Sequence, residues 1–312
     1  MIFLHKQETN SISREAFHEK ILCPVFAAVL ILSCAILPAL ADSHPLIYKV
    51  TDKEGHSIYL LGTMHMISQE TLPIANLDEI LAQVDRVVFE ASEENMEKLA
   101  KGEASEEDAG QTTGMMAVEN NGLSDEAIGM ITEFLSALYG QPADPAAIRQ
   151  ISAQVLAQTL ASQFMEMAGI ENSGYCVDLE VFGKAKALGL KIEGAETMEE
   201  QMSAITLEGG DTAAIEKQIV EMIGNPEAFM EQLNSMVNAY NTGDKDALLA
   251  IFATEGARTS ADAGRNAHFL KVAEQALQDG GRMLIAIGVY HIIAEDSLLN
   301  TLTQAGYTVE KQ

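Results

Sequence analysis

Short apolar runs alternate with longer amphipathic stretches along much of the chain, a pattern typical of α/β proteins. Two apolar runs at 46–50 and 56–61 flank a turn sequence at 52–55, so we predict a β-hairpin there. An amphipathic stretch at 74–84 then leads to a third apolar run at 86–90. The order of strand, helix and strand predicts a βαβ unit.

The middle of the chain has the periodicity of helices. From about 93 to 174, apolar residues recur at three- and four-residue spacing and include many Ala and Met, which predicts a helical insertion or cap. Ser124 is predicted to cap a helix that ends before Gly140, and a second helix is predicted from 145 to 164.

The alternation of helix and strand then resumes and continues to the end of the chain. The predicted elements are a helix at 179–188, a strand at 190–193, further cap helices within about 211–255, a long helix at 260–277, a buried strand at 284–287, a helix at 295–304 and an edge strand at 307–310. We therefore expect an α/β fold, in which a central mixed sheet carries histidines at the C-terminal ends of its strands beneath a large helical cap.

The N-terminal segment has the composition of a secretory signal peptide. Basic residues precede an apolar stretch at 21–40, which ends in the small-x-small sequence Ala39-Leu40-Ala41. We predict that residues 1–41 are removed and that 42–312 form one exported, periplasmic domain without stable membrane insertion. An uncleaved N-terminal membrane anchor is the alternative, because roughly 20 apolar residues span a bilayer.

The charge and cysteine content restrict the classes of partner and of stabilisation. The chain has 46 acidic and 19 basic residues and a formal net charge of −27, which argues against binding to nucleic acid or to anionic membranes. Several of the acidic residues fall between 93 and 108, where we expect a solvated loop. Cleavage of the leader leaves Cys176 as the only cysteine, so we expect no intramolecular disulfide.

Two of the predicted strands end in the same short motif. The run before 62 leads into a Gly-x-x-His sequence that ends at His65, and the run at 284–287 leads into another that ends at His291. A Gly-x-x-His match alone is a weak signal. The shared strand context is stronger, because ligands of parallel sheets bind at the carboxyl ends of the strands. We therefore expect both histidines to reach one crevice.

Two carboxylates also follow predicted strands, Glu90 directly and Glu196 after a short turn. Neutral imidazoles and carboxylates suit a divalent metal with an open position, where bound water becomes a nucleophile near neutral pH. Each residue also has a purely structural interpretation. The histidines could be loop caps, Glu90 a solvated surface group, Glu196 the residue before a helix cap, and Arg265 an ordinary surface ion pair. His268 is expected to be exposed.

The chain resembles the TraB/GumN family, which includes the Tiki proteins. The resembling segments are Tyr59-Leu60-Leu61-Gly62-Thr63-Met64-His65, Val87-Val88-Phe89-Glu90, Lys184-Ala185-Lys186-Ala187-Leu188-Gly189, Ile192-Glu193-Gly194-Ala195-Glu196-Thr197, Gln201, Arg265-Asn266 and Ile287-Gly288-Val289-Tyr290-His291. The resemblance implies a metal-dependent hydrolase site in which His65, His291 and Glu90 hold the metal, with Arg265 as a polar partner. The chain departs from the family pattern at Ala195, His268, Tyr290 and Ile292, close to the expected pocket.

We therefore expect a Tiki-like metalloprotease that acts on a peptide or small-molecule substrate with Mn, Co or Zn. Glu196 is expected to support the site or relay a proton, and Arg265 to stabilise developing negative charge. Three alternatives remain open from the sequence. They are a metal-independent, esterase-like hydrolase, a non-catalytic protein that binds a peptide or signalling ligand, and an accessory role in export or polysaccharide production.

Overall fold

The computed structural model describes residues 46–64, 74–101, 117–167, 177–197, 200, 212–254 and 260–312. The predicted leader at 1–41, His65 and Cys176 lie outside the described residues. Among the described residues, no helix combines the length and the apolar character that crossing a bilayer requires.

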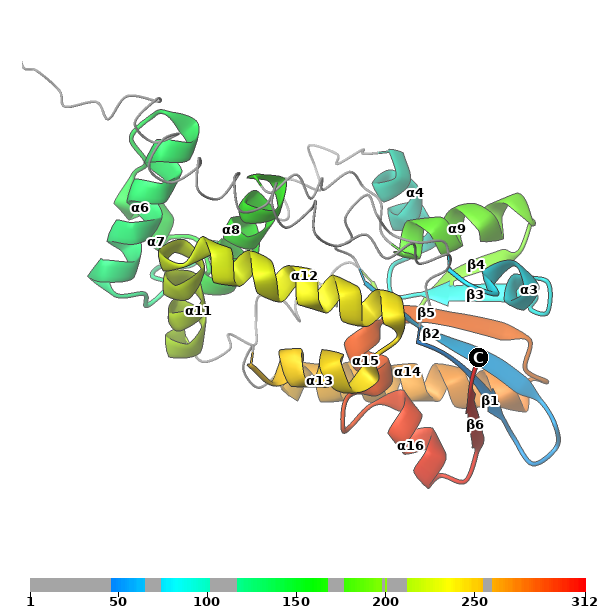
Figure 1. Cartoon of the computed structure of the whole chain (residues 1–312). Helices are drawn as coiled ribbons and strands as arrows, with labels where there is room; N and C mark the ends of the chain where they lie inside the picture. The colour runs from blue at the N-terminus through cyan, green and yellow to red at the C-terminus, as the bar shows by residue number, and fades with distance from the viewer. Residues whose placement is uncertain are drawn as a thin grey trace, which may run out of the picture.

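A six-stranded mixed sheet organises the fold, with strand order β4-β3-β5-β2-β1-β6 (Figure 1). The strands are β1 (Ile47–Thr51), β2 (Ser57–Thr63), β3 (Arg86–Phe89), β4 (Lys191–Gly194), β5 (Met283–Gly288) and β6 (Thr308–Lys311). β1 pairs antiparallel with β2 and β6, while β2, β5, β3 and β4 are parallel. The predicted hairpin and the predicted α/β class are confirmed.

Twelve named α-helices complete the described part of the chain. They are α3 (Leu77–Leu81), α4 (Glu93–Lys101), α6 (Asp125–Tyr139), α7 (Pro145–Arg149), α8 (Ala153–Met167), α9 (Val177–Ala187), α11 (Thr212–Gly224), α12 (Pro226–Thr242), α13 (Lys245–Thr254), α14 (Ser260–Gln278), α15 (Val289–Ile293) and α16 (Leu298–Gln304), of which α15 is a short turn directly after β5. Figure 1 shows α3 and α9 on one side of the sheet and α14 and α16 on the other.

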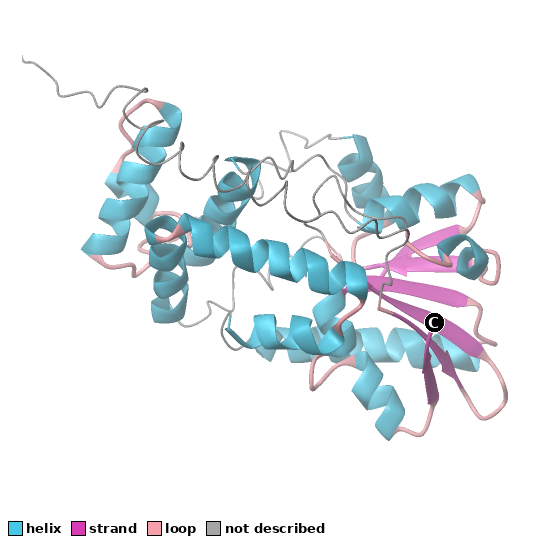
Figure 2. Ribbon diagram, viewed as in Figure 1, coloured by secondary structure: helices cyan, strands magenta, loops and turns pink. Residues whose placement is uncertain are grey.

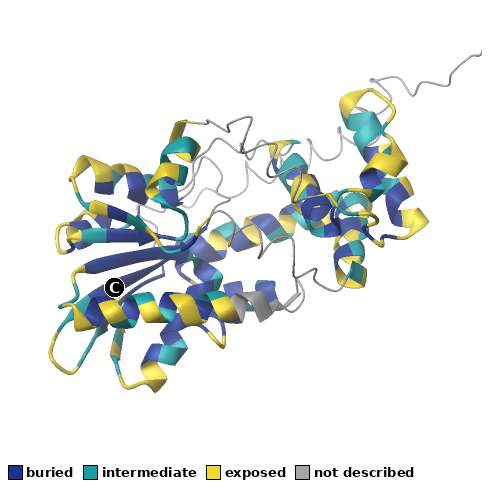
Figure 3. Ribbon diagram, turned by 180° about the vertical axis from the view of Figure 1, so that it is seen from behind, coloured by how far each residue is buried: buried dark blue, intermediate teal, exposed yellow. Residues whose placement is uncertain are grey.

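The described residues form two hydrophobic clusters. The larger cluster surrounds the sheet and includes β2, β5, α9, α12 and α14. The smaller one joins α6, α7, α8 and α11, and Figure 2 shows these helices at the end of the molecule opposite the sheet. In Figure 3 the buried residues follow the strands and the inward sides of the helices. Because Phe229 of α12 packs against both clusters, α12 connects the two cores.

Two expectations about the elements are wrong. The helix predicted from 145 to 164 is divided into α7 and α8, because the Asn121 side chain donates to the carbonyls of Ile148 and Ile151, at 2.9 and 3.0 Å, where a continuous helix would use them. The acidic segment at 93–101 is the helix α4 rather than a loop, since Met96 is buried and Glu94 pairs with Lys98 one turn later.

The sequence did not predict the short helix α15, which carries His291. β5 ends at Gly288 and α15 begins at the next residue. The tight junction depends on Gly62 of the neighbouring β2, because a Cβ there would lie 2.8 Å from Val289 Cγ2. His291 is thereby fixed on a helical turn at the sheet edge.

Candidate functional site

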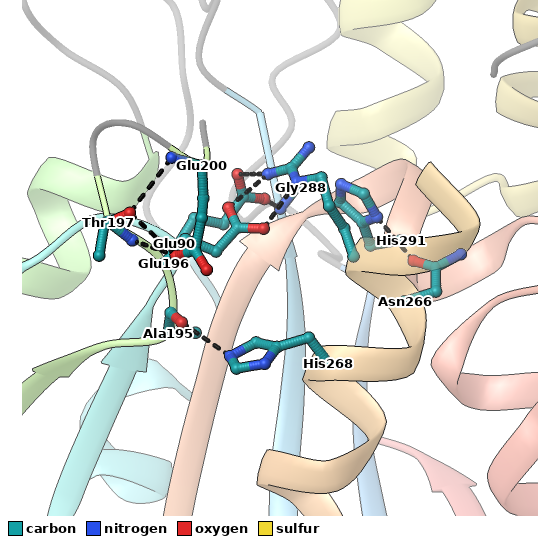
Figure 4. Close-up of polar contacts among 10 residues, drawn as sticks. Glu90, Ala195, Glu196, Thr197, Glu200, Asn266, His268, Gly288 and His291 are labelled. Carbon is teal, nitrogen blue, oxygen red and sulfur yellow. Dashed lines mark hydrogen bonds and ion pairs between the residues drawn. The ribbon is translucent and has the colours of Figure 1, made fainter. Parts of the chain in front are cut away.

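The site is built where the parallel strands end. Glu90 follows β3, and Glu196 lies two residues after β4. Beyond these paired strands the two chain segments continue side by side, because Ala195 N–H donates to Phe89 O at 2.8 Å and Glu196 N–H donates to Glu90 O at 2.9 Å. The backbone pairing therefore places the two carboxylates next to each other, as Figure 4 shows.

Arg265 of α14 binds both carboxylates. Its Nε donates to Glu196 Oε1 at 2.7 Å, and its Nη2 donates to Glu196 Oε2 at 2.8 Å and to Glu90 Oε2 at 2.7 Å. The side chains of Arg265, Glu90 and Glu196 are 20%, 13% and 4% exposed, respectively. This cluster is therefore shielded from water far more than a surface ion pair, and its interactions are correspondingly stronger.

The electrostatics of the cluster keep the guanidinium charged. Burial alone would lower the pKa of Arg265, but the hydrogen bonds to Glu196 and the charges of Glu90 and Glu196 outweigh burial and raise it. Because the pKa in the folded state lies above the ordinary value, this stabilisation is fully present below the ordinary pKa of arginine and is lost only as the pH rises through the raised one. The charge of Arg265 is therefore constant at neutral and acidic pH.

Gly288 brings β5 into the same cluster. Its N–H donates to the second oxygen of Glu90, Oε1, at 2.6 Å. A Cβ at Gly288 would lie 3.1 Å from that oxygen and 3.6 Å from His291 Cδ2. The absence of a side chain therefore allows the strand end to approach both the carboxylate and the imidazole closely.

His291 is buried, with 3% of its surface exposed. Its Nδ1 lies 2.7 Å from Asn266 Oδ1, and Asn266 Nδ2 donates to the carbonyl of Asp296 at 3.1 Å (Figure 4). The ring also packs edge-to-face against Phe269, with a centroid distance of 5.2 Å. Asn266 and Gly288 belong to the segments that resemble the TraB/GumN family, but sequence reasoning assigned them no role. Asn266 follows Arg265 directly, and that adjacency was the available signal.

His65 lies outside the described residues, so its meeting with His291 stays a prediction. The surroundings of the strand that precedes it are described. β2 and β5 are adjacent and parallel, with Thr63 opposite Gly288. Tyr240 of α12 is buried, and its hydroxyl donates to Gly62 O at 2.7 Å. The two strands that carry the Gly-x-x-His motifs therefore end at the same sheet edge.

His268 is exposed, as predicted, but it is not isolated from the site. Its Nε2 lies 2.7 Å from the carbonyl of Ala195, the residue before Glu196. Glu196 also precedes a capping pair, in which Glu200 N–H donates to Thr197 Oγ1 and Thr197 N–H donates to Glu200 Oε2. These bonds from Thr197 lower the pKa of Glu200. The loop that carries Glu196 is thus held from two sides.

A different group has metal-ligand spacing in the described part of the chain. Possible ligand atoms of Asp52, Glu54 and His56 all lie within 4.8 Å of one another. This group sits in the β1–β2 turn, at the end of β2 opposite the carboxylate cluster. Asp52 already accepts bonds from the backbone N–H groups of Glu54 and His56, and its other oxygen lies 2.9 Å from His56 Nδ1. The bonds of an ordinary turn explain the grouping.

Comparison with known proteins assigns the family. The TraB/PrgY/gumN family model matches residues 46–311. The chain belongs to the TraB/PrgY/gumN family. The match includes every strand of the sheet, both Gly-x-x-His motifs and the cluster of Glu90, Glu196 and Arg265. No curated protein and no solved structure matches the chain.

Proposed function

We propose that this TraB family protein is an exported, metal-dependent hydrolase that cleaves peptide bonds, with His65, Glu90 and His291 as the metal ligands. One observation carries the proposal. The buried ring of His291 is held by Asn266, and Gly288 lies against both this ring and the carboxylate of Glu90. Both groups lie at the sheet edge where the strand before His65 also ends.

The described residues have the donor chemistry that a divalent metal requires. The contact with Asn266 occupies Nδ1 of His291, and metal-bound histidines commonly engage their second nitrogen in this way. A carboxylate has about four acceptor positions, so the bonds from Arg265 and Gly288 do not by themselves exhaust Glu90. Two carboxylates against one guanidinium also give the cluster a negative formal charge, which attracts a cation.

In this proposal each residue of the cluster has a separate task. A bound divalent ion would supply an acidified water at neutral pH. Arg265 places a fixed positive charge where the oxygen of a cleaved carbonyl would become negative. Glu196 binds Arg265 through both of its oxygens, so it orients the guanidinium and supports the site. Processing after Ala41 would release the protein into the periplasm, where peptides are available as substrates.

The same cluster supports two other candidate functions. Arg265 gives both carboxylates a cationic partner from within the chain. This charge compensation is compatible with a hydrolase that needs no metal, or with a protein that binds a peptide or signalling ligand without cleaving it. Both differ from the metal-dependent hydrolase in their response to chelators.

Metal-dependent thermal stability tests the proposed ligand set. The mature protein is melted with Mn²⁺, Co²⁺ or Zn²⁺ and with a chelator, and hydrolysis of a mixed peptide library is measured in parallel. An ion that binds only the folded state should stabilise it by about 2.7 kcal/mol at a hundredfold excess over Kd. His65→Ala and His291→Ala should each remove this increment and the peptide hydrolysis.

His56→Ala is the matched control, since it removes a histidine from the other group with metal-ligand spacing. It should keep the full increment. If His56→Ala abolishes the increment and His291→Ala does not, the ion binds in the hairpin turn and the proposed ligand set is wrong. Hydrolysis that persists in chelator would support the metal-independent enzyme, and an absence of both responses would support the binding protein.

A further inference from the structure

We infer that Asn266 is a positioning residue that fixes which ring nitrogen of His291 carries the proton. The contact concerned is the 2.7 Å approach of Asn266 Oδ1 to His291 Nδ1. The value of this role for catalysis rests on the proposed function. The protonation pattern itself does not, because it follows from hydrogen bonds within the chain.

The orientation of the Asn266 amide is determined by its second partner. The carbonyl oxygen of Asp296 can only accept a hydrogen bond, so the amide atom 3.1 Å from it must be the nitrogen. The amide oxygen then faces His291. That oxygen carries no hydrogen, so Nδ1 of His291 must be the donor.

A neutral imidazole has one N–H group, so donation from Nδ1 leaves the lone pair on Nε2. Cδ2, the ring carbon bonded to Nε2, lies next to Gly288, because a Cβ added at Gly288 would be 3.6 Å from it. The N–H of Gly288 in turn donates to Glu90. The ring edge that carries the lone pair therefore lies on the same side of the imidazole as the carboxylate cluster. This nitrogen is the one suited to bind a metal or to accept a proton.

The aromatic contact of the ring does not select this tautomer. Phe269 contacts His291 edge-to-face at 5.2 Å, and an aromatic ring of this kind does not distinguish one neutral imidazole tautomer from the other. In water, neutral histidine favours the proton on Nε2. Loss of the acceptor at 266 should therefore move the proton of His291 from Nδ1 toward Nε2.

A pair of substitutions separates positioning from simple structural support. Asn266→Ala and Asn266→Asp both remove the donor to Asp296, but only aspartate keeps an acceptor for Nδ1. Long-range ¹H–¹⁵N correlations of ¹⁵N-histidine-labelled protein report which nitrogen is protonated, and His291→Gln identifies the signals of His291. The spectra are recorded at about pH 9, above the ordinary pKa of histidine.

We expect Nδ1 to be protonated in the wild type and in Asn266→Asp, and Nε2 to be protonated in most molecules of Asn266→Ala. A wild-type spectrum with the proton on Nε2 would overturn the inference, and this result does not depend on whether an Asn266 variant folds. An Asn266→Ala protein that keeps the wild-type pattern would overturn it as well.

Titration with Mn²⁺ connects the same variants to the proposed function. Loss of a partner that orients a ligand typically weakens metal binding by about 10–100-fold, so we expect this loss in Asn266→Ala but not in Asn266→Asp. If the proton positions agree with the inference and no protein binds Mn²⁺, the metal site fails and the role of Asn266 stands. If Asn266→Ala binds Mn²⁺ as the wild type does, the positioning role fails and the metal site stands.

Discussion

Replacement of Arg265 by methionine should destabilise the protein strongly, although the side chain is partly exposed. Methionine keeps much of the apolar length and removes the guanidinium that joins Glu90 to Glu196. At an effective dielectric constant of about 20, each charge pair at 4 Å contributes about 4 kcal/mol. Loss of one partner of a buried pair costs about 3–5 kcal/mol, because the opposite charge stays buried.

Partial exposure of the cluster reduces this figure. With 20% of the Arg265 side chain exposed, we expect the lower end of that range, about 3 kcal/mol. In a domain of this size, 1 kcal/mol changes the melting temperature by about 2–4 °C, so the expected decrease is about 6–12 °C. Arg265→Lys should fall between methionine and the wild type, because an ammonium lacks the planar fork that binds both carboxylates.

Arg282→Met is the matched control. Arg282 makes two hydrogen bonds to Asp85, at 2.7 and 2.8 Å, but the two side chains are 61% and 66% exposed. The same substitution there should change the melting temperature little, because water screens exposed pairs. The reasoning about buried charge is refuted if Arg265→Met is no less stable than Arg282→Met in thermal and urea unfolding.

Three further predictions concern the fold and its maturation. Gly194→Ala should destabilise the protein by at least about 1–3 kcal/mol in urea unfolding, because the new Cβ would lie 2.5 Å from the backbone Cα of Ser92. Gly183→Ala is the control, and because Gly183 lies in an open helical position, it should stabilise the protein by about 0.5–1 kcal/mol. Tyr240→Phe should cost about 1 kcal/mol by removing the hydrogen bond to Gly62, and unchanged stability would contradict a role for that bond. Protein recovered from the periplasm should have the intact mass expected for cleavage after Ala41, and a mass that includes the leader would favour the membrane anchor.

Much of the local structure could be predicted from the sequence. Ser124 caps α6 through its side-chain oxygen, and Gly140 ends it in the left-handed conformation, which glycine adopts readily because it has no Cβ. The apolar runs of β2 and β5 are buried strands, because continuous apolar character is typical of strands covered on both faces. The break between α7 and α8 was missed because its cause, Asn121, lies more than 25 residues away from the carbonyls that it binds.

The candidate site was only partly predictable. Glu90, Glu196 and His291 could be selected because each follows a predicted strand, and the structure places all three at one sheet edge. Arg265 entered only through the family resemblance, and its ion pairs with both carboxylates depend on how α14 crosses the sheet. The role of Asn266 depends on two contacts with residues far along the chain.

The sequence by itself determined the strands, the residues at their ends and the family, because these follow from periodicity, turn residues and short motifs that neighbouring positions encode. Only the tertiary structure decided that the ends of β3, β4 and β5 meet α14, which brings two carboxylates and one imidazole together with one guanidinium. Strand order and helix crossing arise from packing between distant segments. The charge balance of the site and the partner of each polar atom are properties of that packing, and no local pattern in the chain specifies them.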